Sequence, residues 1–254
     1  MKHFFTILSH EIRMLLVNPS TYIAAVAFLG LMGFVFTGIL DTYSLAPQEA
    51  SPAIVFFQYF YWPVLILVPL LTMKCLAEER RLGTIETLFT TPVNTVEVVL
   101  GKYSAAYSLY LGLWAATGGF FLILKKFSGG AHLLDPGPLI GGYLFIAISG
   151  LLFVAIGVLA SALARNQAVA GIFAFSLLFA LIFGGKYLVA APWLLKTEIL
   201  HPVHAAVAYG HVLGHYEDFT RGVVDLRQLL FYLSGTVLAL IFSILSVEAK
   251  LLHS

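Results

Sequence analysis

The chain has 254 residues, of which 60% are hydrophobic and only 11% are charged, and its formal net charge is +1. Soluble domains carry roughly 25% charged residues, so this chain lacks the polar side chains that a water-facing surface requires. We therefore predict an integral membrane protein, long enough for six spans of about 20 residues with their connections. The small net charge argues against a nucleic-acid partner.

The N-terminal residues 1–18 are predicted to form an amphipathic helix that lies in the membrane interface. Within residues 3–17, apolar side chains recur at helical spacing, while Lys2, His10 and Arg13 are on the other side. Such a helix is too polar to cross a bilayer, and we place it on the cytoplasmic surface. The segment also lacks a small-residue cleavage site after a short apolar core, so we expect no cleavable signal.

Six apolar segments are predicted to span the membrane, which gives an all-α fold in one domain, residues 1–254. The predicted spans are residues 21–40, 54–73, 98–124, 139–163, 168–188 and 229–247. Pro63 and Pro69 in the second span indicate a kink, which either serves packing or acts as a hinge. In the fourth span, Gly150 and Gly157 would allow another helix to approach closely. The outer segment, residues 191–228, is too polar to cross, and we expect a short outer helix or a re-entrant hairpin there.

The distribution of basic residues predicts the orientation of the chain. The first outer loop contains no Lys or Arg, whereas the first inner loop contains Lys74, Arg80 and Arg81. Short loops near the early spans carry the most weight in the positive-inside rule, so both termini are expected in the cytoplasm. Lys125 and Lys126 in a later outer loop run against this assignment.

The polar segment 76–92, between the second and third spans, has the pattern of a short surface helix. Gly83 interrupts the helix that leaves the membrane, and Thr84 can cap a new one. Glu86 would lie in the first turn, and Pro92 would end the helix after about two turns. One apolar face is expected from Ile85, Leu88 and Phe89. The alternative is a simple solvated loop.

Two stretches resemble a known transporter family. The first is Glu-Glu-Arg-Arg-Leu-Gly-Thr-Ile-Glu-Thr-Leu-Phe-Thr-Thr-Pro-Val at residues 78–93, followed by Val-Leu-Gly-Lys-Tyr at residues 99–103. It resembles the coupling-helix segment of type-2 ABC transporter permeases. The second, Asp-Phe-Thr-Arg-Gly-Val-Val-Asp at residues 218–225, resembles the gliding-motility-associated (GldF-like) branch of that family. Together with six spans, the resemblance covers nearly the whole chain.

The resemblance implies a permease of the cytoplasmic (inner) membrane that works with a separate nucleotide-binding ATPase subunit. The permease chain would bind no cofactor, and ATP and Mg would be held by the partner. Residues 78–91 would sit in a groove of that subunit, with polar contacts from Glu78, Glu79, Arg80, Arg81 and Glu86 and buried contacts from Ile85, Leu88 and Phe89. The resemblance also implies export, a homodimer or heterodimer of permeases surrounded by membrane lipids, and, for the gliding-type branch, mechanical work in place of solute transport.

The chain itself has no phosphate-binding loop for ATP. Its two Gly-Lys pairs, Gly101-Lys102 and Gly185-Lys186, are each followed by tyrosine and not by Ser or Thr. We therefore predict that the chain is not an enzyme by itself. We also find no charged residue or histidine at the centre of any predicted span, which argues against a proton- or ion-driven carrier. A channel, a scaffold or a metal-handling membrane protein, each without ATP coupling, is the remaining alternative.

Two further sets of polar residues are candidate sites. The third span is the most polar, and its hydroxyl groups either line a path or serve helix packing; they are Ser104, Tyr107, Ser108, Tyr110 and Thr117. In the outer segment, His204, His211 and His215 are candidate metal ligands, since His211 and His215 are one helical turn apart. Histidines on a wet outer helix, without metal, are the alternative. The single cysteine, Cys75, is expected to be a small apolar filler.

Overall fold

The computed structural model describes residues 3–45, 50–83, 94–127, 135–189 and 209–251. These residues form helices and connecting turns, and no strand occurs among them. Six helical segments in this part of the chain are long and apolar enough to cross a membrane, which confirms the predicted fold class. They are Pro19–Leu45, Tyr61–Leu82, Thr95–Phe127, Pro136–Leu163, Gln167–Gly185 and Leu226–Ala249.

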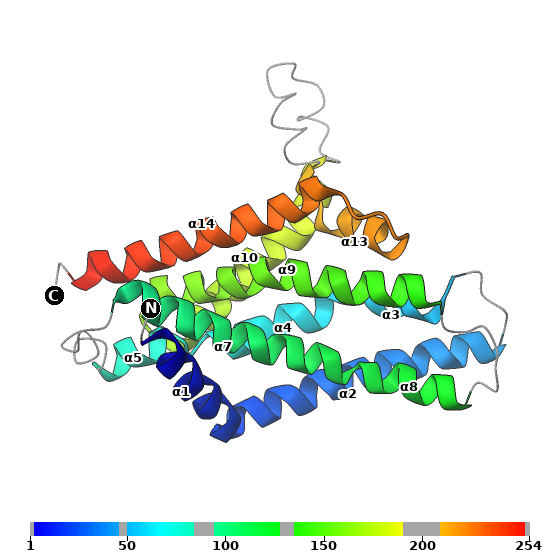
Figure 1. Ribbon diagram of the computed structural model, residues 1–254, viewed down its shortest axis with the longest axis horizontal. Helices are drawn as coiled ribbons and strands as arrows, with labels where there is room; N and C mark the ends of the chain where they lie inside the picture. Colours follow the sequence, from blue (N-terminus) through cyan, green and yellow to red (C-terminus); the bar gives the residue numbers. More distant parts are fainter. Residues whose placement is uncertain (1–2, 46–49, 84–93, 128–134, 190–208, 252–254) are drawn as a thin grey trace, which may run out of the picture.

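The N-terminal helix α1 (Phe4–Val17) crosses the first half of α7 (Thr95–Ala116), at the end of the bundle where α5 and the C-terminal end of α14 also lie (Figure 1). The two helices approach closely, because a Cβ atom at Gly101 would lie 2.7 Å from Ile7 Cγ2. No residue of α1 is fully buried, and Phe5 and Val17 are largely exposed, as expected of an interfacial helix. Pro19 then opens α2 (Pro19–Leu45).

The predicted second span, residues 54–73, is divided between α3 (Pro52–Gln58) and α4 (Tyr61–Thr72). The break falls at Tyr59 and Phe60, just before Pro63, which lies in the first turn of α4, where a missing N–H costs little. Pro69 lies inside α4 and is buried. The third span also has a break, since Thr117 separates α7 from α8 (Gly118–Phe127).

Helix α9 (Pro136–Leu163) is the centre of the bundle and contacts α4, α7, α10, α13 and α14. The glycines of α9 allow these neighbours to approach closely. A Cβ at Gly142 would meet the Phe57 ring at 2.2 Å, and one at Gly150 would meet the Tyr110 ring at 2.3 Å. At Gly157 it would lie 2.4 Å from Thr72 Oγ1. The close approach predicted at Gly150 and Gly157 is therefore confirmed, and the partners are α7 and α4.

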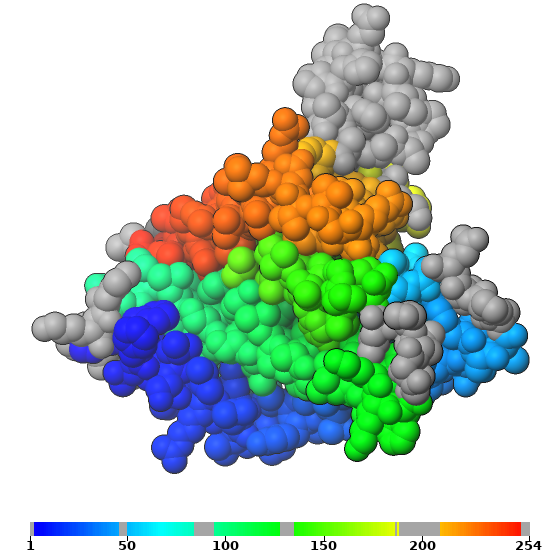
Figure 2. Space-filling view, turned by 45° about the vertical axis from the view of Figure 1, so that its right-hand side comes forward, coloured from blue at the N-terminus to red at the C-terminus, as the bar shows by residue number. Residues whose placement is uncertain are grey.

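The outer segment contributes one described helix, α13 (Val212–Thr220), between α10 (Gln167–Val189) and α14 (Leu226–Leu251). Helix α13 packs on α9 so closely that a Cβ at Gly141 would lie 2.1 Å from the Phe219 carbonyl oxygen. In the space-filling view, the orange and red surfaces of α13 and α14 lie against the green of α9 (Figure 2). Residues 191–208 of the predicted outer segment fall outside the described residues.

We expect Gly157→Val to destabilise the protein by about 1–3 kcal/mol, because the new side chain must displace Thr72 in a closely packed contact. Cys75 is buried and is the chain's single cysteine, so a thiol-reactive dye reports unfolding in detergent directly. Gly112→Val on α7 is the matched control, since nothing lies within 4 Å of a Cβ there. Equal melting midpoints for the two variants would contradict the close α4–α9 contact.

Candidate functional site

Helix α5 (Ala77–Leu82) is the described part of the predicted polar segment, and its first turn is anchored on α9. The backbone N–H groups of Leu76 and Ala77 donate to Ser161 Oγ, at 3.0 and 3.1 Å. The first N–H groups of a helix have no partner within the helix, so Ser161 supplies the acceptor that they need. Just before α5, Lys74 Nζ donates to Ser20 Oγ on α2 at 2.9 Å.

The far end of α5 is also fixed in position. Gly83 adopts a left-handed conformation with φ 68°, which ends the helix as the sequence predicted. Arg80 Nη1 donates to the Ala164 carbonyl oxygen, at the C-terminus of α9, over 2.7 Å. Both ends of α5 are therefore bonded to the end of α9, and the segment that follows residue 83 leaves from a defined point.

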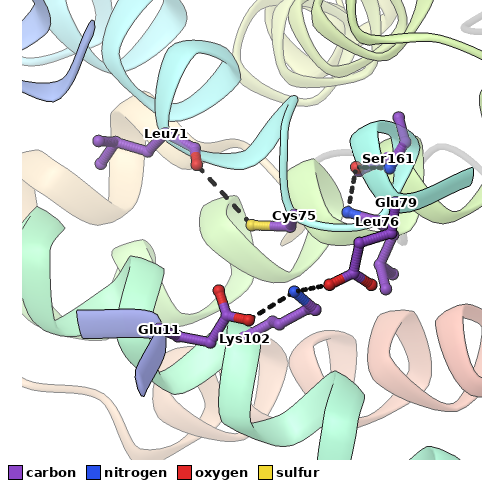
Figure 3. A network of polar contacts seen from close by, with 8 residues as sticks. Glu11, Leu71, Cys75, Leu76, Glu79, Lys102 and Ser161 are labelled. Atoms are coloured by element: carbon purple, nitrogen blue, oxygen red, sulfur yellow. Dashed lines mark hydrogen bonds and ion pairs between the residues drawn. The ribbon is translucent and has the colours of Figure 1, made fainter. Parts of the chain in front are cut away.

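A group of three charged residues joins α5 to two other helices. Lys102 Nζ on α7 lies 2.6 Å from Glu11 Oε1 on α1 and 2.7 Å from Glu79 Oε1 on α5 (Figure 3). The Lys102 side chain is only 5% exposed, whereas those of Glu11 and Glu79 are 20% and 25% exposed. A buried ammonium needs an ionic partner, so these contacts hold α1, α5 and α7 together.

Sequence reasoning placed Glu79 in the site but missed Glu11 and Lys102. In the sequence, Lys102 belongs to the Val-Leu-Gly-Lys-Tyr stretch that carries the family resemblance, but its ionic partners are not evident there. The usable signal was a lone lysine just inside the third span, since an ionisable group in such a place is normally paired. Glu11, on the polar side of the neighbouring interfacial helix, was the available carboxylate.

The other predicted partner-binding residues divide into two groups. Glu78 and Arg81 lie on α5, where Glu78 is half-buried and Arg81 is exposed. The rest lie outside the described residues, so the short helix and its apolar face stay a prediction; these are Thr84, Ile85, Glu86, Leu88, Phe89 and Pro92.

The candidate path-lining residues of α7 are mostly engaged in helix contacts. The Tyr107 hydroxyl donates to the Ala147 carbonyl oxygen at 2.8 Å, and Tyr110 is fully buried beside Gly150. Thr117 is also buried, and its hydroxyl donates to the Trp114 carbonyl oxygen at 2.6 Å. Ser108 is exposed and donates to the Ser104 carbonyl oxygen within α7. These contacts favour the packing interpretation, and a path along α7 stays a prediction.

The candidate histidine site is not assembled in the described part of the chain. His204 lies outside it, and no group of three or more metal-ligating side chains occurs among the described residues. His211 precedes α13, whereas His215 is buried, with Nδ1 3.1 Å from the Tyr232 hydroxyl and Nε2 2.8 Å from the Tyr209 carbonyl oxygen. The expectation that His215 lies on a wet surface is wrong. Burial lowers the pKa of its imidazole.

The chain was compared with known proteins. A family model described as "ABC-2 family transporter protein" matches residues 5–248. The chain belongs to the ABC-2 transporter family. No match was found among curated proteins. The family assignment confirms the resemblance to type-2 ABC permeases and makes this chain the membrane permease component of an ABC transporter, not itself the catalytic subunit. The GldF-like branch stays a prediction. In this ABC-2 permease the motif at residues 218–225 covers the last three residues of α13 and the turn before α14, with Gly222 at φ 80°.

We expect Lys102→Met to destabilise the permease by up to about 3 kcal/mol, because it removes the buried cation that both Glu11 and Glu79 contact. This loss of stability is at the lower end of the range for breaking a buried ion pair, since both carboxylates are partly exposed. Adding Glu11→Gln should restore at least half of the loss. Thermal unfolding in detergent measures the stability of the single and the double variant. Arg81→Met, at an exposed position of α5, is the control. A double variant no more stable than the single one would contradict the ion-pair account.

We expect the stability of the permease to fall as the pH drops below about 6.5, the usual pKa of an unfolded histidine. The lowered pKa of His215 means that the folded state binds a proton less readily than the unfolded state, so acid favours unfolding. His215→Gln should be less stable at pH 7.5 but should lose less stability between pH 7.5 and 5. His10→Gln, at an exposed position of α1, should keep the wild-type slope. Parallel slopes for wild type and His215→Gln would refute this assignment.

Proposed function

We propose that this permease is driven by a separate ATPase subunit that binds α5 and the segment following it, and that the complex exports its substrate. ATP and Mg are held by the partner, and this chain converts movement of that partner into movement of its membrane helices. The partner binds at the cytoplasmic face, which places both termini in the cytoplasm. A second permease, identical or related, completes the transport path, since one set of six spans has no second half to enclose it.

The observation that supports this proposal is the set of contacts around α5. The helix is bonded to α9 through Ser161 and to the end of α9 through Arg80, and Glu79 pairs with Lys102 of α7. Lys102 in turn pairs with Glu11 of the interfacial helix. Short polar contacts therefore pass a force applied to α5 on to α9, α7 and α1. In each of these contacts at least one of the two residues is buried. A simple solvated loop would not need such contacts.

The centre of the bundle is suited to carry that movement further. Helix α9, which receives two of the contacts from α5, packs along α4, α7, α10, α13 and α14. The glycine contacts leave no space for α9 to slide independently of α4 and α7, so these helices move as a unit. Movement at α5 thus reaches α13 at the opposite end of the bundle (Figure 1).

The test is an affinity purification of the full-length permease from its native membrane in mild detergent. We expect a P-loop ATPase subunit to co-purify with the wild type, and Glu86→Lys to reduce its yield at least tenfold, because a reversed charge at the partner surface weakens docking. Glu217→Lys is the matched control, an exposed carboxylate on α13 at the other end of the bundle. ATPase activity of each eluate is measured in parallel.

Either of two outcomes would refute the proposal. If no ATPase co-purifies with the wild type, ATP coupling through this chain is wrong, and a channel or scaffold role takes its place. If the ATPase co-purifies equally with wild type, Glu86→Lys and Glu217→Lys, the partner docks elsewhere on the permease.

A further inference from the structure

A long apolar groove lies along the outer surface of α14. It has a volume of about 890 Å³ and is lined by Tyr209, Arg227, Leu230, Phe231, Leu233, Ser234, Val237, Leu238, Ile241 and Phe242. Helix α14 packs against α9 with its other side and forms an edge of the described bundle (Figure 1). Leu230, Val237 and Leu238 are each more than half exposed in the groove.

The groove has polar groups mainly at one end. Arg227, at the start of α14, is exposed, and its backbone N–H donates to Asp225 Oδ1 at 2.9 Å. Tyr209 faces the same end, with its ring 6.4 Å from that of Phe231. Further along, Ser234 uses its hydroxyl to bond the Phe231 carbonyl oxygen within α14. The groove therefore combines a guanidinium and a phenol at its entrance with a hydrocarbon wall beyond them.

Tyr209 is held in place from behind. Its carbonyl oxygen accepts a hydrogen bond from His215 Nε2 at 2.8 Å, and His215 also bonds the Tyr232 hydroxyl of α14. His215 is 6% exposed and Tyr232 is fully buried, so this support belongs to the core of the bundle. The backbone at Tyr209 is thus fixed before any ligand arrives, which lowers part of the entropic cost of binding.

We propose that this groove binds one glycerophospholipid, with its phosphate at Arg227 and the Tyr209 hydroxyl and an acyl chain along α14. Arginine is the side chain best suited to phosphate, and a cation at the end of an apolar span lies at headgroup depth. Arg227 and Phe242 are separated by about 22 Å along a helix that rises about 1.5 Å per residue, enough to cover one leaflet of about 15 Å. The proposal is independent of ATP coupling.

Charge distinguishes this occupant from a second copy of the chain. A copy packed on the same face about a two-fold axis along the membrane normal would bring its own Arg227 toward this one, and two like charges repel. A phospholipid offers a phosphate at the depth of Arg227 and hydrocarbon below it.

The test is native mass spectrometry of the delipidated, full-length permease titrated with phosphatidylglycerol and, separately, with the diacylglycerol that carries the same acyl chains. We expect the first phosphatidylglycerol molecule to bind at least tenfold more tightly than further phosphatidylglycerol molecules. It should also bind at least tenfold more tightly than diacylglycerol. This comparison needs no variant, so it does not depend on the folding of a mutant.

Variants then locate the site. Arg227→Gln should weaken the tight binding about tenfold, whereas Arg221→Gln, an exposed arginine beyond the end of α13, should not. Ser234→Trp should fill the groove and abolish the tight binding, and Leu245→Trp, on the exposed side of α14 outside the groove, should leave it intact. The thiol-dye melting curve confirms that each variant is folded.

The proposal is overturned if phosphatidylglycerol and diacylglycerol bind equally, or if Arg227→Gln and Ser234→Trp both bind as the wild type does. The proposal is also overturned if Ser234→Trp converts a dimer to a monomer while the number of bound lipids stays unchanged. The groove would then be an interface between two copies of the chain.

Discussion

The contact on which this end of the molecule depends is the pairing of Lys102 with Glu11 and Glu79. An ammonium that is 5% exposed is stable as a cation only where carboxylates replace its water, and here they come from α1 and α5, far apart in the sequence. One side chain therefore joins α1 and α5 to α7, in addition to the hydrogen bonds that anchor α5 on α9. Both carboxylates retain some contact with solvent.

The bundle around this group is organised by α9. Small residues on α9 let four neighbours, α3, α4, α7 and α13, approach within distances that a Cβ atom would prevent, and large aromatic side chains fill much of the space that results. Phe57 lies against Gly142, and Tyr110 lies against Gly150. Dispersion contacts of this kind replace the hydrophobic effect between helices in a membrane, where the lipid is as apolar as the side chains. Helix α9 also receives the hydrogen bonds of α5 at its C-terminal end. The helix that organises the packing of the bundle is therefore also the one through which we propose that movement of α5 is transmitted.

The two ends of the bundle differ in chemistry. At the α5 end, charged side chains join helices through ion pairs, whereas at the α13 end a buried neutral histidine joins Tyr209 and Tyr232. The first arrangement leaves two carboxylates partly exposed at the end of the bundle where we propose that the ATPase subunit binds. The second supports the aromatic and cationic entrance of an apolar groove, which suits a lipid. Under our proposals for this ABC-2 permease, the α5 end faces the cytoplasm and the groove on α14 faces the bilayer. Charged side chains suit the first surface and apolar side chains suit the second.

The sequence by itself determined the membrane class, the six spans and the polar segment with its stop at Gly83, because composition and helical periodicity are local properties. It also indicated close packing at Gly150 and Gly157, although not the partners. Only the tertiary structure decided which charges meet: Lys102 and Glu11 are far apart in the chain, and nothing local in the sequence specifies their pairing. His215 was misplaced for the same reason. Glu217 and Asp218 follow it closely in the sequence, but its environment comes largely from α14, because burial depends on what packs against a residue and not on what adjoins it.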